Sequence, residues 1–163
     1  MQNHNQKLRT GMVVLVIVVA VALLNNVLQE GSITGQFIDR EEKAVTRVID
    51  GDTILVEGGD RVRLLDIDTP ERGEPCYKEA KDRLAELIDN RIVVLEKSGE
   101  NKDQYDRLLR YVVYNNTNIN VLLVREGMAN TYFYNKNSPY YSQLIQAEQA
   151  AKSERLCVWK EVK

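Results

Sequence analysis

Three short polar blocks carry the residue types that could perform chemistry in this chain. They are Ile-Asp-Gly-Asp-Thr at 49–53, Asp-Thr-Pro-Glu at 68–71 and Asp-Gln-Tyr-Asp-Arg at 103–107. Arg63 adds a positive charge within an otherwise apolar segment. Each block alone is a weak signal, because an Asp-Gly pair serves a turn without any chemistry. Together they supply carboxylates, two arginines and a tyrosine, an inventory that suits metal-assisted attack on a phosphodiester.

The composition excludes several other kinds of site. The only histidine, His4, lies among polar residues near the N-terminus. A Ser-His-Asp hydrolase, a histidine-dependent ribonuclease or a histidine-rich zinc site therefore lacks its essential side chain. The net charge of −2, from 22 basic and 24 acidic residues, shows no basic excess. A nucleic acid would have to be bound at a local site rather than over a broad surface.

Residues 1–28 are predicted to be a signal peptide or a signal anchor. Lys7 and Arg9 precede an uninterrupted apolar run at 12–24. The run is long enough for a signal peptide but shorter than the roughly 20 residues of a comfortable membrane span, so both alternatives stay open. No acidic residue precedes Glu30, so we expect the rest of the chain to be exported. It would be secreted, or attached to the membrane with its folded domain outside the cytoplasm.

The remaining chain divides into a linker at 29–43 and a folded domain at 44–163. Hydrophobic patterning and turn residues predict three strands at 45–49, 53–57 and 61–67, then a helix that begins near Pro75. A strand at 91–96, a polar loop at 97–104, a strand at 108–114, a helix at 119–126 and a last helix from Ser138 to about 154 follow. This order predicts a mainly β, α+β domain in which helices pack on a small closed barrel.

Over this domain the sequence resembles the staphylococcal-nuclease-like (thermonuclease) family. The three polar blocks match in order and spacing, as do Arg-Leu-Leu at 63–65, Glu-Ala at 79–80 and the closing Leu-x-x-Trp at 156–159. The resemblance implies an OB-fold five-stranded barrel with three packed helices. It also implies a Ca²⁺-dependent nuclease that cleaves DNA or RNA at the 5′ P–O bond and leaves 3′-phosphate ends. Nothing in the sequence demands more than a monomer.

The resemblance also implies a metal site and a general base. Asp52 and Asp68 would bind Ca²⁺ through their carboxylates, and Thr69 would add its backbone carbonyl. Oxygen ligands of this kind suit Ca²⁺, which tolerates irregular geometry and retained water. Glu71 would act as general base toward the attacking water, or orient it.

The other implied roles concern the substrate. Arg63 and Arg107 would hold the phosphate and stabilise the charge that develops in the transition state. Tyr105 would contact a terminal phosphate or sugar, and Leu109 would line the base pocket. Either Tyr132 or Tyr134 would stack on the base, with packing in the core as the alternative for each.

Two positions depart from the family pattern. Gln104 stands where the best-known members carry a lysine, and Asp106 replaces a glycine directly before Arg107. We expect these changes to weaken nucleotide affinity and to leave the chemistry intact, because one removes a phosphate contact and the other adds negative charge.

A catalytically inactive OB-type module that binds nucleic acid or protein is the alternative function. An inactive copy should have lost an arginine or a carboxylate from the set described above, yet all of them are present. The domain also lacks the basic excess of a protein that only binds nucleic acid. These two observations favour the enzyme.

Cys76 and Cys157, the only cysteines, are expected to form a disulfide. Export would place them in an oxidising compartment, and the family resemblance implies that the start of the first helix and the end of the last lie near each other. Two buried free thiols are the alternative.

Overall fold

The structure, a computed structural model, describes residues 39–133 and 137–160. The predicted targeting segment at 1–28, the linker up to residue 38 and Tyr134 lie outside the described residues. Within the described ranges, no helix combines the length and the apolar character needed to cross a membrane.

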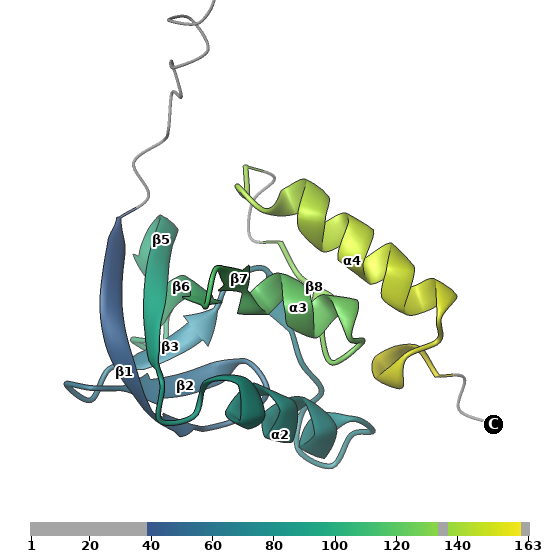
Figure 1. Cartoon of the computed structure of the whole chain (residues 1–163), viewed down its shortest axis with the longest axis horizontal. Helices are drawn as coiled ribbons and strands as arrows, with labels where there is room; N and C mark the ends of the chain where they lie inside the picture. Colours follow the sequence, from purple (N-terminus) through teal and green to yellow (C-terminus); the bar gives the residue numbers. More distant parts are fainter. Residues whose placement is uncertain (1–38, 134–136, 161–163) are drawn as a thin grey trace, which may run out of the picture. The chain divides into compact units, whose positions relative to one another are not determined.

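The described residues build a closed β-barrel. Its strands are β1 (Arg40–Val48), β2 (Thr53–Val56), β3 (Arg61–Leu64), β5 (Ile92–Lys102) and β6 (Leu108–Tyr114), with the short β7 (Thr117–Asn118) added beside β6. The sheet order is β3-β2-β1-β5-β6-β7, and a parallel pairing of β3 with β6 closes the barrel (Figure 1). Its interior is filled by β-branched and leucine side chains, among them Ile54, Val62 and Leu95, each fully buried.

Two strands extend further than the sequence predicted. β1 begins at Arg40, so residues 40–43 of the expected linker belong to the barrel, where they pair with β5. β5 in turn continues to Lys102, through most of the expected polar loop at 97–104. Strand pairing uses backbone groups, so a polar sequence can join a ladder when its side chains face solvent or find partners. Arg40 does so by an ion pair of 2.7 Å with the buried Glu96.

The third strand is shorter than predicted, and its end redirects the chain. β3 stops at Leu64, and Asp66 adopts a positive φ of 58°. The chain then forms β4 (Ile67–Asp68), which pairs with β8 (Asn130–Thr131) outside the barrel ladder. Aspartate is one of the few non-glycine residues that tolerates this left-handed conformation. The turn carries Asp68 away from the barrel wall and toward the other polar blocks.

Three α-helices cover the barrel in the described part of the chain. They are α2 (Tyr77–Ile88), α3 (Ile119–Arg125) and α4 (Tyr141–Ser153), followed by the 3₁₀ turn η1 (Cys157–Trp159). The helices α2 and α4 each bury one stripe of residues at helical spacing, such as Ala80, Leu84 and Ile88 of α2. α3 and α4 pack side by side, and α2 packs against β1 (Figure 1). The expected OB-fold barrel with three helices is confirmed.

The boundaries of α3 follow from its capping residues. Asn118 caps the N-terminus, its side chain accepting a hydrogen bond of 3.0 Å from Val121 N. Gly127 ends the helix with a φ of 70°. A Cβ atom on Gly127 would lie 2.5 Å from Cβ of Leu156, so the close approach of the C-terminal segment also requires glycine here.

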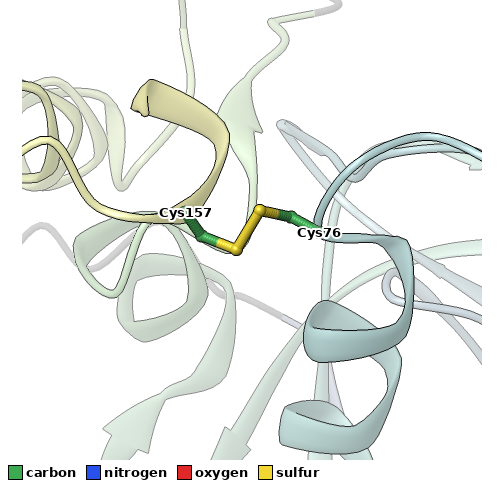
Figure 2. Close-up of a disulfide and its surroundings, with 2 residues drawn as sticks. All are labelled: Cys76 and Cys157. Carbon is green, nitrogen blue, oxygen red and sulfur yellow. A yellow bond between two sulfur atoms is a disulfide. The ribbon is translucent and has the colours of Figure 1, made fainter. Parts of the chain in front are cut away.

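A disulfide joins the two ends of the helical layer. Cys76 precedes α2 and Cys157 begins η1, and their sulfur atoms are bonded (Figure 2). Their Cα atoms are 5.9 Å apart, within the range that a disulfide spans without backbone movement. The bond closes a sequence separation of 81 residues, which includes the barrel strands β5, β6 and β7.

Loss of this disulfide should lower the free energy of unfolding by roughly 4 kcal/mol. The bond restricts the unfolded chain to conformations with a closed loop, so its removal raises the entropy of the unfolded state and stabilises that state. The measurement is urea unfolding of the wild type, with and without reductant, and of the Cys76→Ser/Cys157→Ser double variant. Reduced wild type and the double variant should agree. Two alkylatable thiols in unreduced protein, detected by mass spectrometry, would contradict the assignment.

Candidate active site

The turn between β1 and β2 brings the first polar block toward the loop after β4. Asp50 Oδ1 accepts a hydrogen bond of 3.1 Å from Asp52 N, which tightens the turn. Gly51 lies directly against Thr69, since a Cβ on Gly51 would be 2.7 Å from Thr69 Oγ1. The Asp-Gly-Asp sequence therefore does more than reverse the chain. It packs the turn against the second polar block and points Asp52 into the space between them.

Asp52 is the buried anchor of this arrangement, with 7% of its surface exposed. Its Oδ2 accepts hydrogen bonds from Thr69 N at 3.0 Å and from Thr69 Oγ1 at 2.8 Å. Its Oδ1 accepts one from Thr53 Oγ1 at 3.1 Å and lies 3.1 Å from Arg63 Nε. A carboxylate so far from water is stable only with such partners.

Arg63 is equally buried, at 6% exposure, and connects three segments. Its Nη1 donates to the carbonyl oxygens of Leu64 and Ile67, at 2.8 and 2.7 Å. Its Nη2 donates to Asp68 Oδ1 at 2.8 Å. The arginine that stood out within an apolar segment thus holds the turn after β3 in shape and pairs with both Asp52 and Asp68.

Around Asp52 and Arg63, carboxylates outnumber positively charged side chains. Burial raises the pKa of Asp50, and the nearby charge of Asp52 raises it further. Burial also raises the pKa of Asp68, and Arg63 opposes this effect only in part, because Asp52 and Glu74 add to it. A site in which carboxylates resist ionisation in this way favours a bound cation.

These side chains line one cavity of about 350 Å³. The predicted residues that face it are the following: Asp52, Arg63, Asp68, Thr69, Glu71, Arg107 and Tyr132. Asp50, which sequence reasoning assigned only to the turn, lines it too, and its place in the same block as Asp52 was the available signal. Among the described residues, no group of three or more His, Cys, Asp or Glu side chains is arranged to hold a metal ion.

Arg107 reaches the cavity from the loop that precedes β6. Asp103 holds it there, accepting hydrogen bonds from Arg107 N at 3.0 Å and Arg107 Nε at 2.7 Å. Asp103 also accepts one from Tyr105 N at 2.9 Å, and Arg61 donates to the Tyr105 carbonyl at 2.8 Å. The guanidinium of Arg107 lies 5.4 Å from the centre of the Tyr105 ring. Sequence reasoning gave Asp103 and Arg61 no individual role.

The two departures from the family pattern lie in this same loop. Asp106 has a φ of 62°, a conformation that glycine adopts without strain, and its carboxylate pairs with Lys102 at 2.7 Å. The ion pair compensates the negative charge that the substitution adds. Gln104 is exposed and lines a second, neighbouring cavity.

The second cavity, of about 440 Å³, shares Arg107 with the first. Tyr105 and Leu109 line it, whereas Tyr132 lines the first cavity. The residues predicted to contact the substrate therefore divide between two adjoining hollows, one lined by carboxylates and one with an apolar wall.

Asp103→Asn should lower the free energy of unfolding by roughly 1–2 kcal/mol at pH 7, because charge-assisted hydrogen bonds weaken. Burial acts to raise the pKa of Asp103, but hydrogen bonds from Arg107 and Tyr105 outweigh it and hold the pKa below its usual value. The stabilisation is therefore complete above the unfolded pKa and is lost as pH falls through the lower folded one. Urea unfolding from pH 7 to below about 4 should show the two proteins converging. A difference independent of pH would contradict this role.

Comparison with known proteins gives one consistent result. Residues 61–161 match the sequence profile of the family described as "Staphylococcal nuclease homologue". The chain is 35% identical to the thermonuclease of Staphylococcus intermedius over 94% of its own length and 98% of the relative's. It is 30% identical to the thermonuclease of Staphylococcus hyicus, with the same coverage. It is 40% identical to the micrococcal nuclease of Shigella flexneri over 71% of each chain. With its barrel and its order of polar blocks, the chain belongs to the staphylococcal nuclease family.

Proposed function

We propose that this protein is a calcium-dependent nuclease that hydrolyses the 5′ P–O bond of DNA or RNA and leaves 3′-phosphate ends. The observation that carries the proposal is the meeting of two arginines and several carboxylates at one cavity of about 350 Å³. Relatives named thermonuclease and micrococcal nuclease support a hydrolase of this kind with a nucleic acid substrate.

Calcium is the proposed cofactor, with Asp52, Asp68 and the backbone carbonyl of Thr69 as ligands. The donor set fits a hard cation because every member is an oxygen, and water would complete the coordination. The raised pKa values of Asp50 and Asp68 support the same assignment, since burial first and neighbouring carboxylates second disfavour a negative charge that a bound cation would stabilise. When bound, the ion supplies positive charge to the phosphate and to the attacking water.

The side chains of the chain itself would do the remaining work. Glu71 is exposed and lines the cavity, and it would accept a proton from the attacking water, or orient it. Arg63 and Arg107 would bind the phosphate oxygens and stabilise the charge that develops on them. Asp103 and Asp52 hold these two guanidinium groups in place before substrate binds. Such preorganisation is what makes electrostatic stabilisation effective.

We also propose that the enzyme works outside the cytoplasm as a monomer. Lys7 and Arg9 precede the apolar run at 12–24, and this pattern supports export. Residues 1–28 would then be either cleaved off as a signal peptide or kept as a membrane anchor. The disulfide supports the same location, because disulfides persist in oxidising compartments.

The full chain should hydrolyse single-stranded DNA in Ca²⁺ and stop in chelator. The new ends should resist polymerase extension until a phosphatase removes the 3′-phosphate. Full activity in chelator would contradict the calcium requirement. Binding of DNA without cleavage under any metal condition would instead support the inactive binding module.

Glu71→Gln and Arg107→Ala should each lower turnover by a factor of about 10² or more, because each removes transition-state stabilisation. Arg63 is tested as Arg63→Lys, since Arg63→Ala would leave buried Asp52 without its cation and destabilise the fold. Glu42→Gln, an exposed change on β1, is the matched control for charge loss. Single-turnover cleavage rates provide the measurement, and a near-wild-type rate for Glu71→Gln would remove Glu71 from the mechanism.

A further inference from the structure

Asp66 is a buried carboxylate for which neither the fold nor the proposed chemistry fully accounts. It lies in the turn between β3 and β4 and is 4% exposed. Its Oδ2 accepts a hydrogen bond from the hydroxyl of Tyr111. Its Oδ1 has no hydrogen-bond donor among the described residues, and Asp66 forms no ion pair with any of them. Oδ1 is not one of the buried atoms left without a partner, so it is open to the cavity that Asp66 lines and can accept a hydrogen bond from a ligand there.

This carboxylate lines the second cavity, beside the catalytic one. Leu65, Leu109 and Tyr111 form a small apolar cluster at its wall. Its volume of about 440 Å³ lies in the range of small-molecule sites. Arg107 lines both cavities, so a nucleotide whose phosphate contacts Arg107 can place its base against this wall.

The other carboxylates of the second cavity are less suited to contact a base. Asp103 already accepts three hydrogen bonds from Tyr105 and Arg107. Glu100 is exposed on β5. Asp66 is thus the buried acceptor of this cavity with an oxygen still available among the described residues.

We propose that Asp66 selects the base of the bound nucleotide by accepting a hydrogen bond from its exocyclic amino group. Adenine carries such a donor at C6 and cytosine at C4, whereas thymine and uracil present a carbonyl oxygen at C4 and guanine presents one at C6. A carbonyl facing Asp66 sets two hydrogen-bond acceptors against each other, which weakens binding. The inference rests on the proposed function and adds base preference to it.

A purely structural role for Asp66 makes a different prediction from base selection. Its left-handed backbone favours Asp or Asn over most residues, and its bond to Tyr111 anchors β6 to the turn. Asp66→Asn keeps the backbone preference and an acceptor for Tyr111, but it places an N–H donor where the cavity had an acceptor. The variant therefore separates base recognition from support of the fold.

The test compares dCMP with dUMP, two nucleotides that differ at the amino or carbonyl group of the pyrimidine ring. Isothermal titration of the full chain in Ca²⁺ should give a dissociation constant about fivefold or more lower for dCMP in the wild type. In Asp66→Asn the ratio should fall to about one or reverse. Asp60→Asn, an exposed change of the same chemistry in the β2–β3 turn, should keep the wild-type ratio.

Cleavage provides the second measurement. Sequenced ends from a random single-stranded oligonucleotide pool should show adenine and cytosine enriched at one position beside the cut, and Asp66→Asn should lose that enrichment. A wild type that binds dCMP and dUMP equally, or binds neither, overturns the inference whether or not the variant folds. A dCMP preference that Asp66→Asn retains, with a wild-type melting temperature, overturns it too. A protein that shows the predicted binding ratios but cleaves nothing would contradict the proposed function and leave the role of Asp66 standing.

Discussion

The buried contact between Asp52 and Arg63 is the interaction on which the candidate site depends. Two charges removed from water are tolerable only when each is paired and hydrogen-bonded, and here those partners come from separate segments. Asp52 takes its donors from Thr53, at the start of β2, and from Thr69, while Arg63 binds the carbonyls of Leu64 and Ile67. The same contacts that compensate the buried charges therefore assemble the cavity of the candidate site. Removal of either charge would disturb the site and the fold together.

A second set of contacts supports the rim of the cavity from the helical layer. On α4, Glu148 accepts hydrogen bonds from the backbone and the hydroxyl of Thr131, at 2.9 and 2.8 Å. Thr131 belongs to β8, whose partner β4 ends in Asp68. Burial raises the pKa of Glu148, but its hydrogen bonds with Lys152 and Thr131 prevail and hold that pKa below its usual value. The helices therefore connect to Asp68 of the cavity through one short pair of strands.

The sequence predicted the barrel, its helices and most of the cavity, because those features depend on local patterns and on polar blocks with recognisable spacing. The sequence pattern misplaced the ends of β1, β3 and β5. A strand ends where its backbone loses a pairing partner, and side-chain polarity does not report where that happens. The sequence could not foresee the second cavity's acidic lining. Asp66 resembles any polar residue in a strand pattern until the left-handed turn places it beside Tyr111. Asp103 is similar, because its role arises only from the way Arg107 folds back toward it.

The parallel pairing of β3 with β6 has a consequence for how the molecule comes into being. Arg63 lies on β3 and is paired in register with Leu109 of β6, two residues after Arg107, so the two guanidinium groups meet only when this seam closes. The pairing of β3 with β6 joins segments that are far apart in the sequence. Long-range strand pairing of this kind forms late in folding, because the intervening loop must close first. A chain whose synthesis has not yet reached β6 cannot form this pairing and therefore lacks the cavity that contains both arginines. Closure of the barrel and assembly of the two-arginine cavity therefore depend on the same strand pairing.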